Sequence, residues 1–289
     1  MDLKQLLYFV TISDEGNISN AAKKLYLTQP PLSYQMKLLE DELNCTLFER
    51  GTRNIKLTDE GQLLYQRAKD ILDLTSITKD ELLSFSESDI GTIRIGMVSS
   101  VASSYGAKWI GEFSKKYPKI QFEIIEANTY ILLNKLKENL IHLAIIRSPY
   151  SETKYERMVL AQEPLYAIGL PDIFREETEC IDLKQLCQYP LITYRRWKKI
   201  VESSFLTAGY VPHFKCICDD ARTTMSLCEE NVGIGIVPYS ASTTSLDSGM
   251  ISKSITDLSL TSNIELIYDA KSYIPKCSKL FIEYMRDNL

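Results

Sequence analysis

The sequence predicts an α + α/β protein: a helical amino-terminal domain, one long helix, and an α/β carboxy-terminal region. Up to Ser88, apolar residues recur at helical spacing, interrupted by the adjacent prolines of LTQPPLSYQ at residues 27–35. From Gly91 onward, short apolar strand patterns alternate with amphipathic helical patterns, as in α/β folds. The 289 residues, 45% hydrophobic and 25% charged, are enough for two or three globular domains.

A helix, a second helix, a sharp turn, a third helix and a hairpin are expected within residues 1–58. The first helix should end near Gly16, since glycine favours a helix stop. Ser19 can cap the second helix and Thr28 the third. LFERGTRNIKLT, at residues 47–58, alternates around a turn as a β-hairpin does. This order predicts a winged helix-turn-helix, whose third helix enters the major groove of DNA. A small three-helix bundle that only packs is the alternative.

The two adjacent prolines, Pro30 and Pro31, are expected to start the third helix rather than break one. Amides in the first helical turn have no intrahelical acceptor, so a residue without an N–H costs little there. Leu32, Met36 and Leu39 then form an apolar face, with polar side chains on the other face.

Charge is distributed unevenly over an acidic chain, whose net charge is −5 and whose pI is about 5.3. No Asp or Glu occurs in residues 16–39, which contain Lys23, Lys24 and Lys37, or in residues 50–58, which contain two arginines and a lysine. Such windows predict two local basic surfaces able to neutralise phosphates. Ordinary solvated faces are the alternative interpretation.

The first 60 residues resemble the DNA-binding domain of LysR-type transcriptional regulators. The match is dense and nearly without gaps over FVTISDEGNISNAAKKLYLTQPPLSYQMKLLEDELNCTLFERGTRNIKLTDEG. The matching marks are Ala21–Ala22, Leu25, Thr28–Gln29–Pro30, Leu32–Ser33, Leu38, Glu40, Leu43, Leu47–Phe48, Arg50, Leu57–Thr58 and Gly61. The resemblance implies a transcription regulator that binds double-stranded promoter DNA.

The same resemblance implies which side chains face DNA. On the third helix they are Thr28, Gln29, Pro30, Pro31, Ser33, Tyr34 and Lys37, and on the wing they are Arg50, Thr52 and Arg53. The family often has an arginine that contacts a base where this chain has Tyr34.

Residues 59–88 predict one long helix, with Thr58 as its N-cap. Leu64, Ala68, Ile71, Thr75, Thr78, Leu82 and Phe85 step alternately by four and three, as in a heptad seam. The pattern favours a dimerisation helix, and the resemblance implies the same, with dimers that commonly pair into tetramers. A helix packed along its own domain is the alternative.

Residues 89–289 predict an α/β domain with parallel sheets covered on both faces. The region resembles the family's effector domain, which has two lobes like those of periplasmic binding proteins. The expected first lobe spans about 91–161 and 265–289, and the second about 162–264.

Ligands of parallel α/β sheets sit beyond the carboxyl ends of the strands. The polar residues expected there are Ser99, Ser100, Ser103, Thr129, Arg147, Thr193, Tyr194, Arg195 and Arg196. Arg147, with Arg195 or Arg196, can clamp a carboxylate or phosphate, because guanidinium groups match these anions. The alternative is that these arginines form interlobe or surface ion pairs. His142 stands where the family often has Asp.

Other chemistry finds little support in the sequence. The seven cysteines include no CxxC pair, which fits reduced thiols. Gly233–Pro238 reads GIGIVP, which predicts a buried strand rather than a dinucleotide-binding turn. Cys216 and Cys218 have neither the number of ligands nor the spacing that a metal site needs. Cys180 and Cys187 leave a redox switch open as an alternative. The two histidines belong to no recognisable catalytic arrangement, so no enzyme is expected.

The sequence therefore predicts a cytoplasmic LysR-type regulator with no cofactor, no metal and no membrane segment. Its expected partners are promoter DNA, further copies of itself and a small carboxylate or phosphate effector, with RNA polymerase as a further candidate. The other hypotheses are a redox-responsive regulator of the same fold and a ligand-binding protein without a regulatory role.

Overall fold

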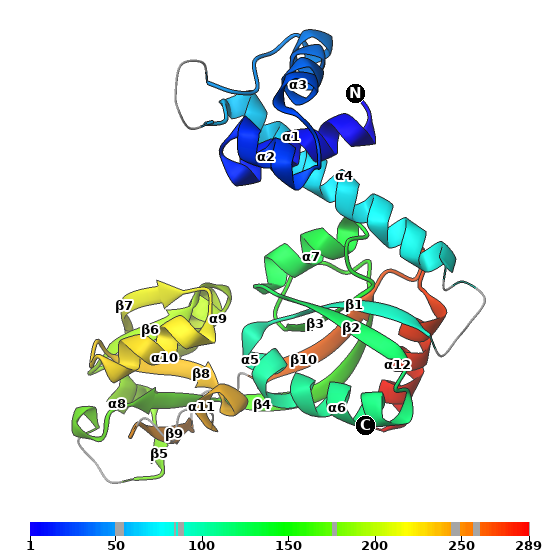
Figure 1. Ribbon diagram of the computed structural model, residues 1–289. Coiled ribbons are helices and arrows are strands. Elements are labelled where there is room, and N and C mark those ends of the chain that lie inside the picture. Colours follow the sequence, from blue (N-terminus) through cyan, green and yellow to red (C-terminus); the bar gives the residue numbers. More distant parts are fainter. Residues whose placement is uncertain are drawn as a thin grey trace. The chain divides into compact units, whose positions relative to one another are not determined.

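The computed structural model describes residues 1–49, 55–83, 85, 90–174, 178–243, 249–256 and 261–288. The chain divides into two compact units, Met1–Leu83 and Ser84–Leu289 (Figure 1). Among the described residues, no helix combines the length and the apolar character needed to cross a membrane.

The first unit is helical. Its helices are α1 (Leu3–Glu15), α2 (Ile18–Lys24), α3 (Gln29–Leu43) and α4 (Asp59–Leu83). A β-bridge joins Phe48 to Leu57, while residues 50–54 of the predicted hairpin lie outside the described residues. The buried side chains that form its core include Leu6, Phe9, Ala21, Leu32, Met36, Leu39, Leu47 and Ala68. The helix-turn-helix order predicted from the sequence is therefore confirmed.

The helix ends of this unit follow local capping chemistry, with one difference from prediction. α1 ends at Gly16, which has a φ of 60°, as expected. α2 is capped by Asn17, whose Oδ1 accepts hydrogen bonds from the amides of Ser19 at 2.8 Å and Asn20 at 3.3 Å. The prediction of Ser19 as the cap was wrong because the helix begins at Ile18, which places Ser19 inside it.

Thr28 occupies the N-cap position of α3 with extended backbone, but its side chain accepts no capping hydrogen bond. Pro30 and Pro31 lie in the first turn of the helix, as predicted. Tyr26, between α2 and α3, has a φ of 56°, a left-handed conformation that sharpens the turn.

The long helix α4 is anchored at its start by Thr58. The Thr58 hydroxyl donates to the Thr46 carbonyl at 2.6 Å and accepts from the Gly61 amide at 3.0 Å. Leu64 and Ala68, expected in a dimer seam, instead pack on the unit's own core. The remaining described seam positions are exposed: Ile71, Thr75, Thr78, Leu82 and Phe85.

The second unit is built on one mixed sheet with strand order β2-β1-β3-β10-β4-β8-β6-β7. Its first lobe contains three parallel strands, β1 (Gly91–Met97), β2 (Ile120–Glu126) and β3 (Leu143–Arg147). The helices of this lobe are α5 (Ser99–Val101), the π-helical turn η1 (Ala102–Gly106), α6 (Ala107–Lys116), α7 (Thr129–Lys137) and α12 (Lys276–Asp287). Figure 1 shows α7 on one side of the sheet and α6 and α12 on the other.

The second lobe contains β6 (Pro190–Tyr194), β7 (His213–Cys218) and β8 (Ile234–Pro238), which are parallel to one another. The short strand β5 (Cys180–Ile181) pairs with β9 (Ile251–Ile255). The remaining elements are η2 (Pro171–Ile173), α8 (Leu183–Leu186), α9 (Arg195–Thr207), α10 (Ala221–Glu229) and α11 (Tyr239–Thr243).

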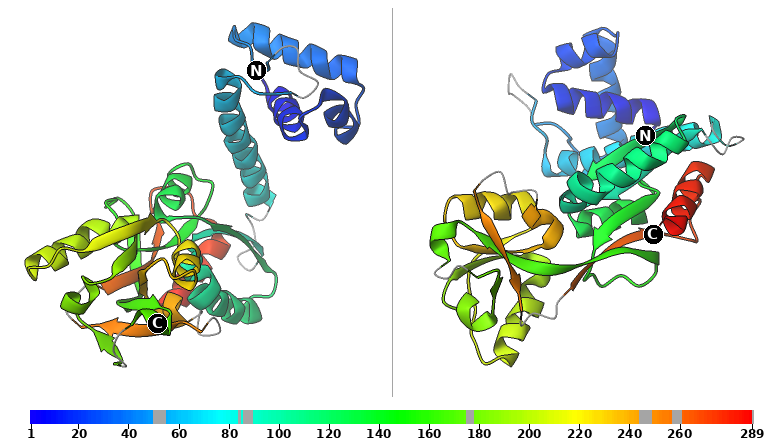
Figure 2. Two further views of the ribbon diagram at one scale, coloured as in Figure 1. Left: turned by 90° about the vertical axis from the view of Figure 1, so that its left-hand side faces the viewer. Right: turned by 90° about the horizontal axis from the view of Figure 1, so that it is seen from below.

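Two strands join the lobes, β4 (Glu156–Gly169) and β10 (Thr261–Tyr268) (Figure 2). β4 pairs with β10 over Glu156–Pro164 and with β8 over Leu165–Ile168, always antiparallel. The expectation of parallel sheets therefore holds for β1, β2 and β3 and for β6, β7 and β8, but not for β4 and β10. β10 returns from the second lobe, lies between β3 and β4, and runs in the opposite direction to both.

Each lobe has its own hydrophobic core. The core of the first lobe is rich in aromatic rings, with the Phe113 and Phe281 centroids 5.0 Å apart. The core of the second lobe surrounds Trp197, Phe205 and Ile236, which are fully buried. This arrangement places the ends of β3 and β6, and the start of α9, between two separately packed bodies.

Candidate functional sites: a helix face and an interlobe cluster

The amino-terminal part of α3 presents the predicted DNA-facing side chains on one surface. Leu32, Met36 and Leu39 are buried on the opposite face. The exposed residues are Thr28, Gln29, Pro30, Pro31, Tyr34 and Lys37, while Ser33 is half-buried. The Ser19 hydroxyl donates to Gln29 Oε1 at 3.1 Å, which ties the start of α3 to α2. The predicted wing residues Arg50, Thr52 and Arg53 lie outside the described residues.

The lysines near this surface differ in how they are paired. Lys24 forms an exposed ion pair with Glu15 at 2.7 Å, and the hydrogen bond that Lys24 donates to Glu15 raises the pKa of Lys24. Lys23 and Lys37 form no ion pair among the described residues and stay exposed. Lys37 can therefore meet a phosphate without first losing an internal partner.

A second set of predicted residues meets where the two lobes join. We call it the interlobe cluster: Ser99, Ser100, Thr129, Arg147, Thr193, Tyr194 and Arg196. Ser99 and Ser100 follow β1, Thr129 starts α7, and Arg147 ends β3, all in the first lobe. Thr193 and Tyr194 end β6, and Arg196 lies in the first turn of α9, in the second lobe.

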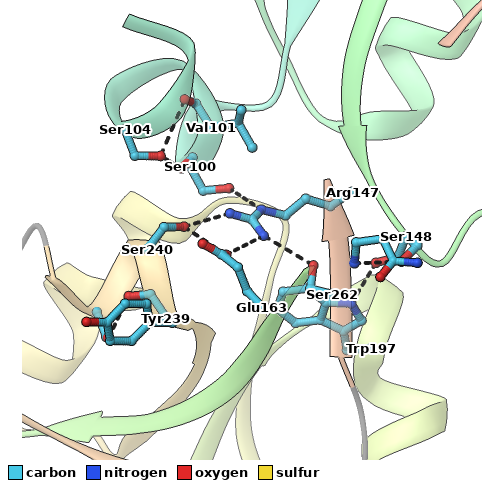
Figure 3. Close-up of polar contacts among 12 residues, drawn as sticks. Ser100, Val101, Ser104, Arg147, Ser148, Glu163, Trp197, Tyr239, Ser240 and Ser262 are labelled. Carbon is cyan, nitrogen blue, oxygen red and sulfur yellow. Dashed lines mark hydrogen bonds and ion pairs between the residues drawn. The ribbon is translucent and has the colours of Figure 1, made fainter. Parts of the chain in front are cut away.

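Arg147 is fully buried and engaged by both lobes (Figure 3). Its Nη1 forms an ion pair with Glu163 Oε2 at 2.7 Å and a hydrogen bond with the Ser262 hydroxyl at 3.3 Å. Its Nε donates to the Ser100 hydroxyl at 3.0 Å, and its Nη2 donates to Ser240 of α11 at 2.7 Å. The guanidinium therefore holds the lobes together in this structure. This agrees with the alternative in which the arginines form interlobe or surface ion pairs.

Arg196 crosses from the second lobe to the first. Its Nη1 donates to the Thr129 hydroxyl at 2.8 Å and contacts the Arg147 carbonyl at 3.4 Å. The neighbouring Trp197 indole donates to the Ser148 carbonyl at 3.2 Å. Burial lowers the pKa of Arg196 to about 10, since few charged groups offset the loss of water around its guanidinium.

The other predicted effector residues are placed differently from one another. Arg195 points to the surface and pairs with Asp219 at 2.9 Å. The Ser103 hydroxyl is exposed and donates to the Ser99 carbonyl at 3.1 Å. The hydroxyls of Thr193 and Tyr194 are buried and have no hydrogen-bond partner among the described residues. Arg195 and Ser103 therefore lie outside the interlobe cluster.

Asp220, at the start of α10, adds a carboxylate to the same region. The Ser99 hydroxyl donates to Asp220 Oδ2 at 2.5 Å, which joins the two lobes. Burial alone would raise the pKa of Asp220, but hydrogen bonds from Ser99 and from the backbone and side chain of Arg222 lower it overall.

Comparison with known protein families covers both units. The model described as a bacterial regulatory helix-turn-helix protein of the lysR family matches residues 3–62. The model described as a LysR substrate binding domain matches residues 86–289. The chain belongs to the LysR family of transcriptional regulators. The resemblances stated for the first 60 residues and for the α/β region are thus confirmed.

Named relatives agree with this membership. The LysR chain is 28% identical over 289 residues to the transcriptional regulator BsdA of Bacillus subtilis, covering 98% of this chain and 99% of BsdA. It is 30% identical over 251 residues to the regulator BenM of Acinetobacter baylyi, covering 83% and 81% of the two chains. These relatives are named as regulators and not as enzymes, which supports the expectation that this protein is not an enzyme.

Solved LysR structures share the fold. The crystal structure of CbnR, a LysR family transcriptional regulator, matches with a TM-score of 0.82 at 22% identity, covering 99% of each chain. Full-length CbnR complexed with its target DNA also gives 0.82, at 23% identity and full coverage of both chains. Both units of this chain therefore have the fold seen in LysR regulators.

Four residues that contact the interlobe cluster were not predicted from the sequence. Glu163, Ser240 and Ser262 contact Arg147, and Asp220 contacts Ser99. Asp220 follows β7, so the rule that favours strand ends would have included it. Glu163 and Ser262 lie on the strands that join the lobes, whose antiparallel pairing the sequence pattern did not indicate.

The cysteines of the LysR chain are all free. Burial raises the pKa of Cys218 and raises that of Cys228 to about 12, so both thiols stay protonated and poorly reactive near neutral pH. The described residues contain no group of three or more His, Cys, Asp or Glu side chains able to hold a metal ion. Cys180 and Cys187, the pair that left a redox switch open, are both free; Cys180 is exposed and Cys187 is half-buried. The family findings do not favour a redox-responsive mechanism. GIGIVP forms the buried strand β8 as predicted.

Proposed function

We propose that this LysR-type DNA-binding regulator responds to a small anionic metabolite held in the interlobe cluster. The observation that carries the proposal is the polar content of that cluster. Two arginines and several hydroxyls gather between bodies with separate cores, and interlobe hydrogen bonds such as Ser99–Asp220 join the lobes directly. An anion that enters there competes with these contacts and changes the angle between the lobes.

We further propose that α3 contacts the bases and backbone of promoter DNA through its exposed face, and that the protein acts as a homo-oligomer. The exposed apolar residues of α4 support the second part, since Leu63 is 62% exposed and Leu82 is 69% exposed. Two linked DNA-binding units on one duplex gain affinity from their high effective concentration. RNA polymerase is the partner through which such a complex would act on transcription.

The experiment has two stages. A thermal-shift screen of the full-length protein against carboxylates, phosphates and amino acids should find a compound that raises Tm, because a bound ligand stabilises only the folded state. That compound should then alter the footprint on a DNA site selected from a random pool. A regulator whose DNA footprint responds to peroxide and to none of these compounds would contradict the proposal.

A further inference from the structure

We propose that the interlobe cluster takes a singly charged carboxylate and that Arg196 is the side chain that binds it. The proposal rests on the proposed function and specifies the ligand class and the residue. It concerns the three arginines near the ends of β3 and β6, whose surroundings in the structure are different.

Two of the three arginines already have a carboxylate partner. Arg147 pairs with Glu163 in a fully buried contact, and Arg195 pairs with Asp219 at the surface. Arg196 instead contacts only uncharged acceptors, the Thr129 hydroxyl and the Arg147 carbonyl. Among the described residues it forms no ion pair. Its positive charge is therefore the one that lacks a bound counter-charge.

Two buried hydroxyl groups without partners occur at the end of β6, two and three residues before Arg196 in the chain. The side-chain oxygens of Thr193 and Tyr194 are buried, with no hydrogen bond among the described residues. The Tyr194 ring stacks on Trp197 at a centroid distance of 4.7 Å. The Arg196 guanidinium lies 5.7 Å from the Tyr194 ring centroid and 5.1 Å from that of Trp197. Because a buried hydroxyl without a partner is unfavourable, these groups indicate an acceptor that the protein chain does not supply.

The charges around the cluster select the ligand class. One uncompensated guanidinium in a partly desolvated site is neutralised by one negative charge, whereas a dianion leaves a buried charge unpaired. The Asp220 carboxylate of the second lobe acts electrostatically on Arg196 and is held by Ser99 and Arg222. The Asp220 carboxylate repels additional negative charge on a ligand. The planar guanidinium also matches a carboxylate with two parallel hydrogen bonds.

The test uses one tryptophan as a reporter. The chain has two tryptophans, and Trp197 lies in contact with the site while Trp109 stacks on Tyr105 in the first lobe. Full-length Trp109→Phe protein is titrated with sodium acetate and, separately, with sodium sulfate at constant ionic strength, and Trp197 fluorescence is recorded. Acetate should saturate the signal, and sulfate should bind roughly tenfold more weakly or not at all.

Three variants in the Trp109→Phe background assign the binding residue. Arg196→Gln should weaken acetate binding by about tenfold or more. Tyr194→Phe should weaken acetate binding severalfold without lowering the Tm of the free protein, because the deleted hydroxyl has no partner to lose. Lys199→Gln, on the exposed side of the same helix, is the control of equal charge change and should keep the affinity of the parent protein.

Equal acetate affinity in Arg196→Gln and the parent protein would overturn the assignment. Binding of sulfate in preference to acetate would overturn the ligand class and leave the anionic effector of the proposed function standing. If neither anion binds and no compound in the metabolite screen shifts Tm, both proposals fail together.

Discussion

At the scale of single residues, the buried ion pair of Arg147 and Glu163 is the main electrostatic feature of the second unit. Their side chains are 0% and 3% exposed, so neither charge is solvated by bulk water. Ser100, Ser240 and Ser262 complete the hydrogen bonding of Arg147. A pair of this kind contributes little in net terms, but removal of one partner leaves the other charge buried alone.

Glu163→Gln is therefore expected to destabilise the second unit by about 3–5 kcal/mol. Both tryptophans lie in this unit, so urea unfolding followed by tryptophan fluorescence reports on it directly. The double variant Arg147→Met/Glu163→Leu should lose less than Glu163→Gln alone, because no unpaired charge remains. A loss within the error of the method for Glu163→Gln would show that Arg147 is solvated.

The contact between Ser99 and Asp220 should make the stability of the second unit depend on pH. The folded-state pKa of Asp220 lies below its ordinary value of 3.8, so the contact stabilises the folded state above pH 3.8. This contribution is lost as pH falls through the lower folded-state pKa. Free energies of unfolding for wild type and Asp220→Asn should differ at neutral pH and converge below pH 3.8. A difference that stays constant with pH would rule out this role of Asp220.

At the scale of elements, the helix-turn-helix depends on short capping contacts because its helices are short. α2 has only 7 residues, too few for stability in isolation. Asn17 satisfies two of its free amides, and the apolar pair Ala21–Ala22 packs it against α1 and α3. The position of α3 therefore rests on both local caps and the common core.

Asn17→Ala should destabilise the first unit by about 1 kcal/mol, since two amides of the first turn of α2 lose their acceptor. Ser19→Ala removes only an exposed hydrogen bond to Gln29 and serves as the control. Hydrogen exchange of the α2 amides measures the effect. Equal protection in the two variants would contradict the assignment of Asn17 as the cap.

The exposed face of α3 leads to a prediction about DNA binding. Lys37→Ala should weaken binding to selected and random DNA alike and lower the salt-dependence slope by about one, as expected for a phosphate contact. Ser33→Ala should weaken binding to the selected site only. Fluorescence anisotropy over a salt series separates the two, and a Lys37→Ala effect confined to the selected site would mean that Lys37 contacts a base instead.

At the scale of the whole molecule, the exposed side of α4 is the surface through which copies of the chain are expected to associate. Ile71 is 38% exposed and Leu74 is 40% exposed, although both are large apolar residues on a helix. Leu64 and Ala68, by contrast, are used by the first unit's own core. The part of the predicted seam that remains available is its carboxy-terminal portion.

Ile71→Glu is expected to shift the protein toward monomer in sedimentation velocity, because a charge enters the apolar contact between copies. Affinity for a two-fold symmetric DNA site should fall more than affinity for a half-site, since only the symmetric site gains from linkage. Gln66→Glu, at an exposed position of the same helix, is the charge-matched control. An unchanged oligomer in Ile71→Glu would place the interface elsewhere.

The sequence by itself determined the elements whose signals are local. The helix-turn-helix order, the prolines in the first turn of α3 and the exposed face from Thr28 to Lys37 all follow from periodicity and capping within a few residues. The parallel strands β1, β2, β3, β6, β7 and β8 follow from apolar runs between helices. The strand-end rule also selected Arg147, Thr193 and Arg196 before their neighbours were known.

Only the tertiary structure decided how these side chains are paired. Glu163 lies 16 residues from Arg147, Ser240 lies 93 away, and Asp220 lies 121 residues from Ser99. No local pattern carries information over such separations, because strand β4 places Glu163 while α11 and the start of α10 place Ser240 and Asp220. The partner of each charge determines whether it is free to bind a ligand. For that reason the sequence offered Arg147 together with Arg195 or Arg196, and the fold distinguished Arg196 from the other two.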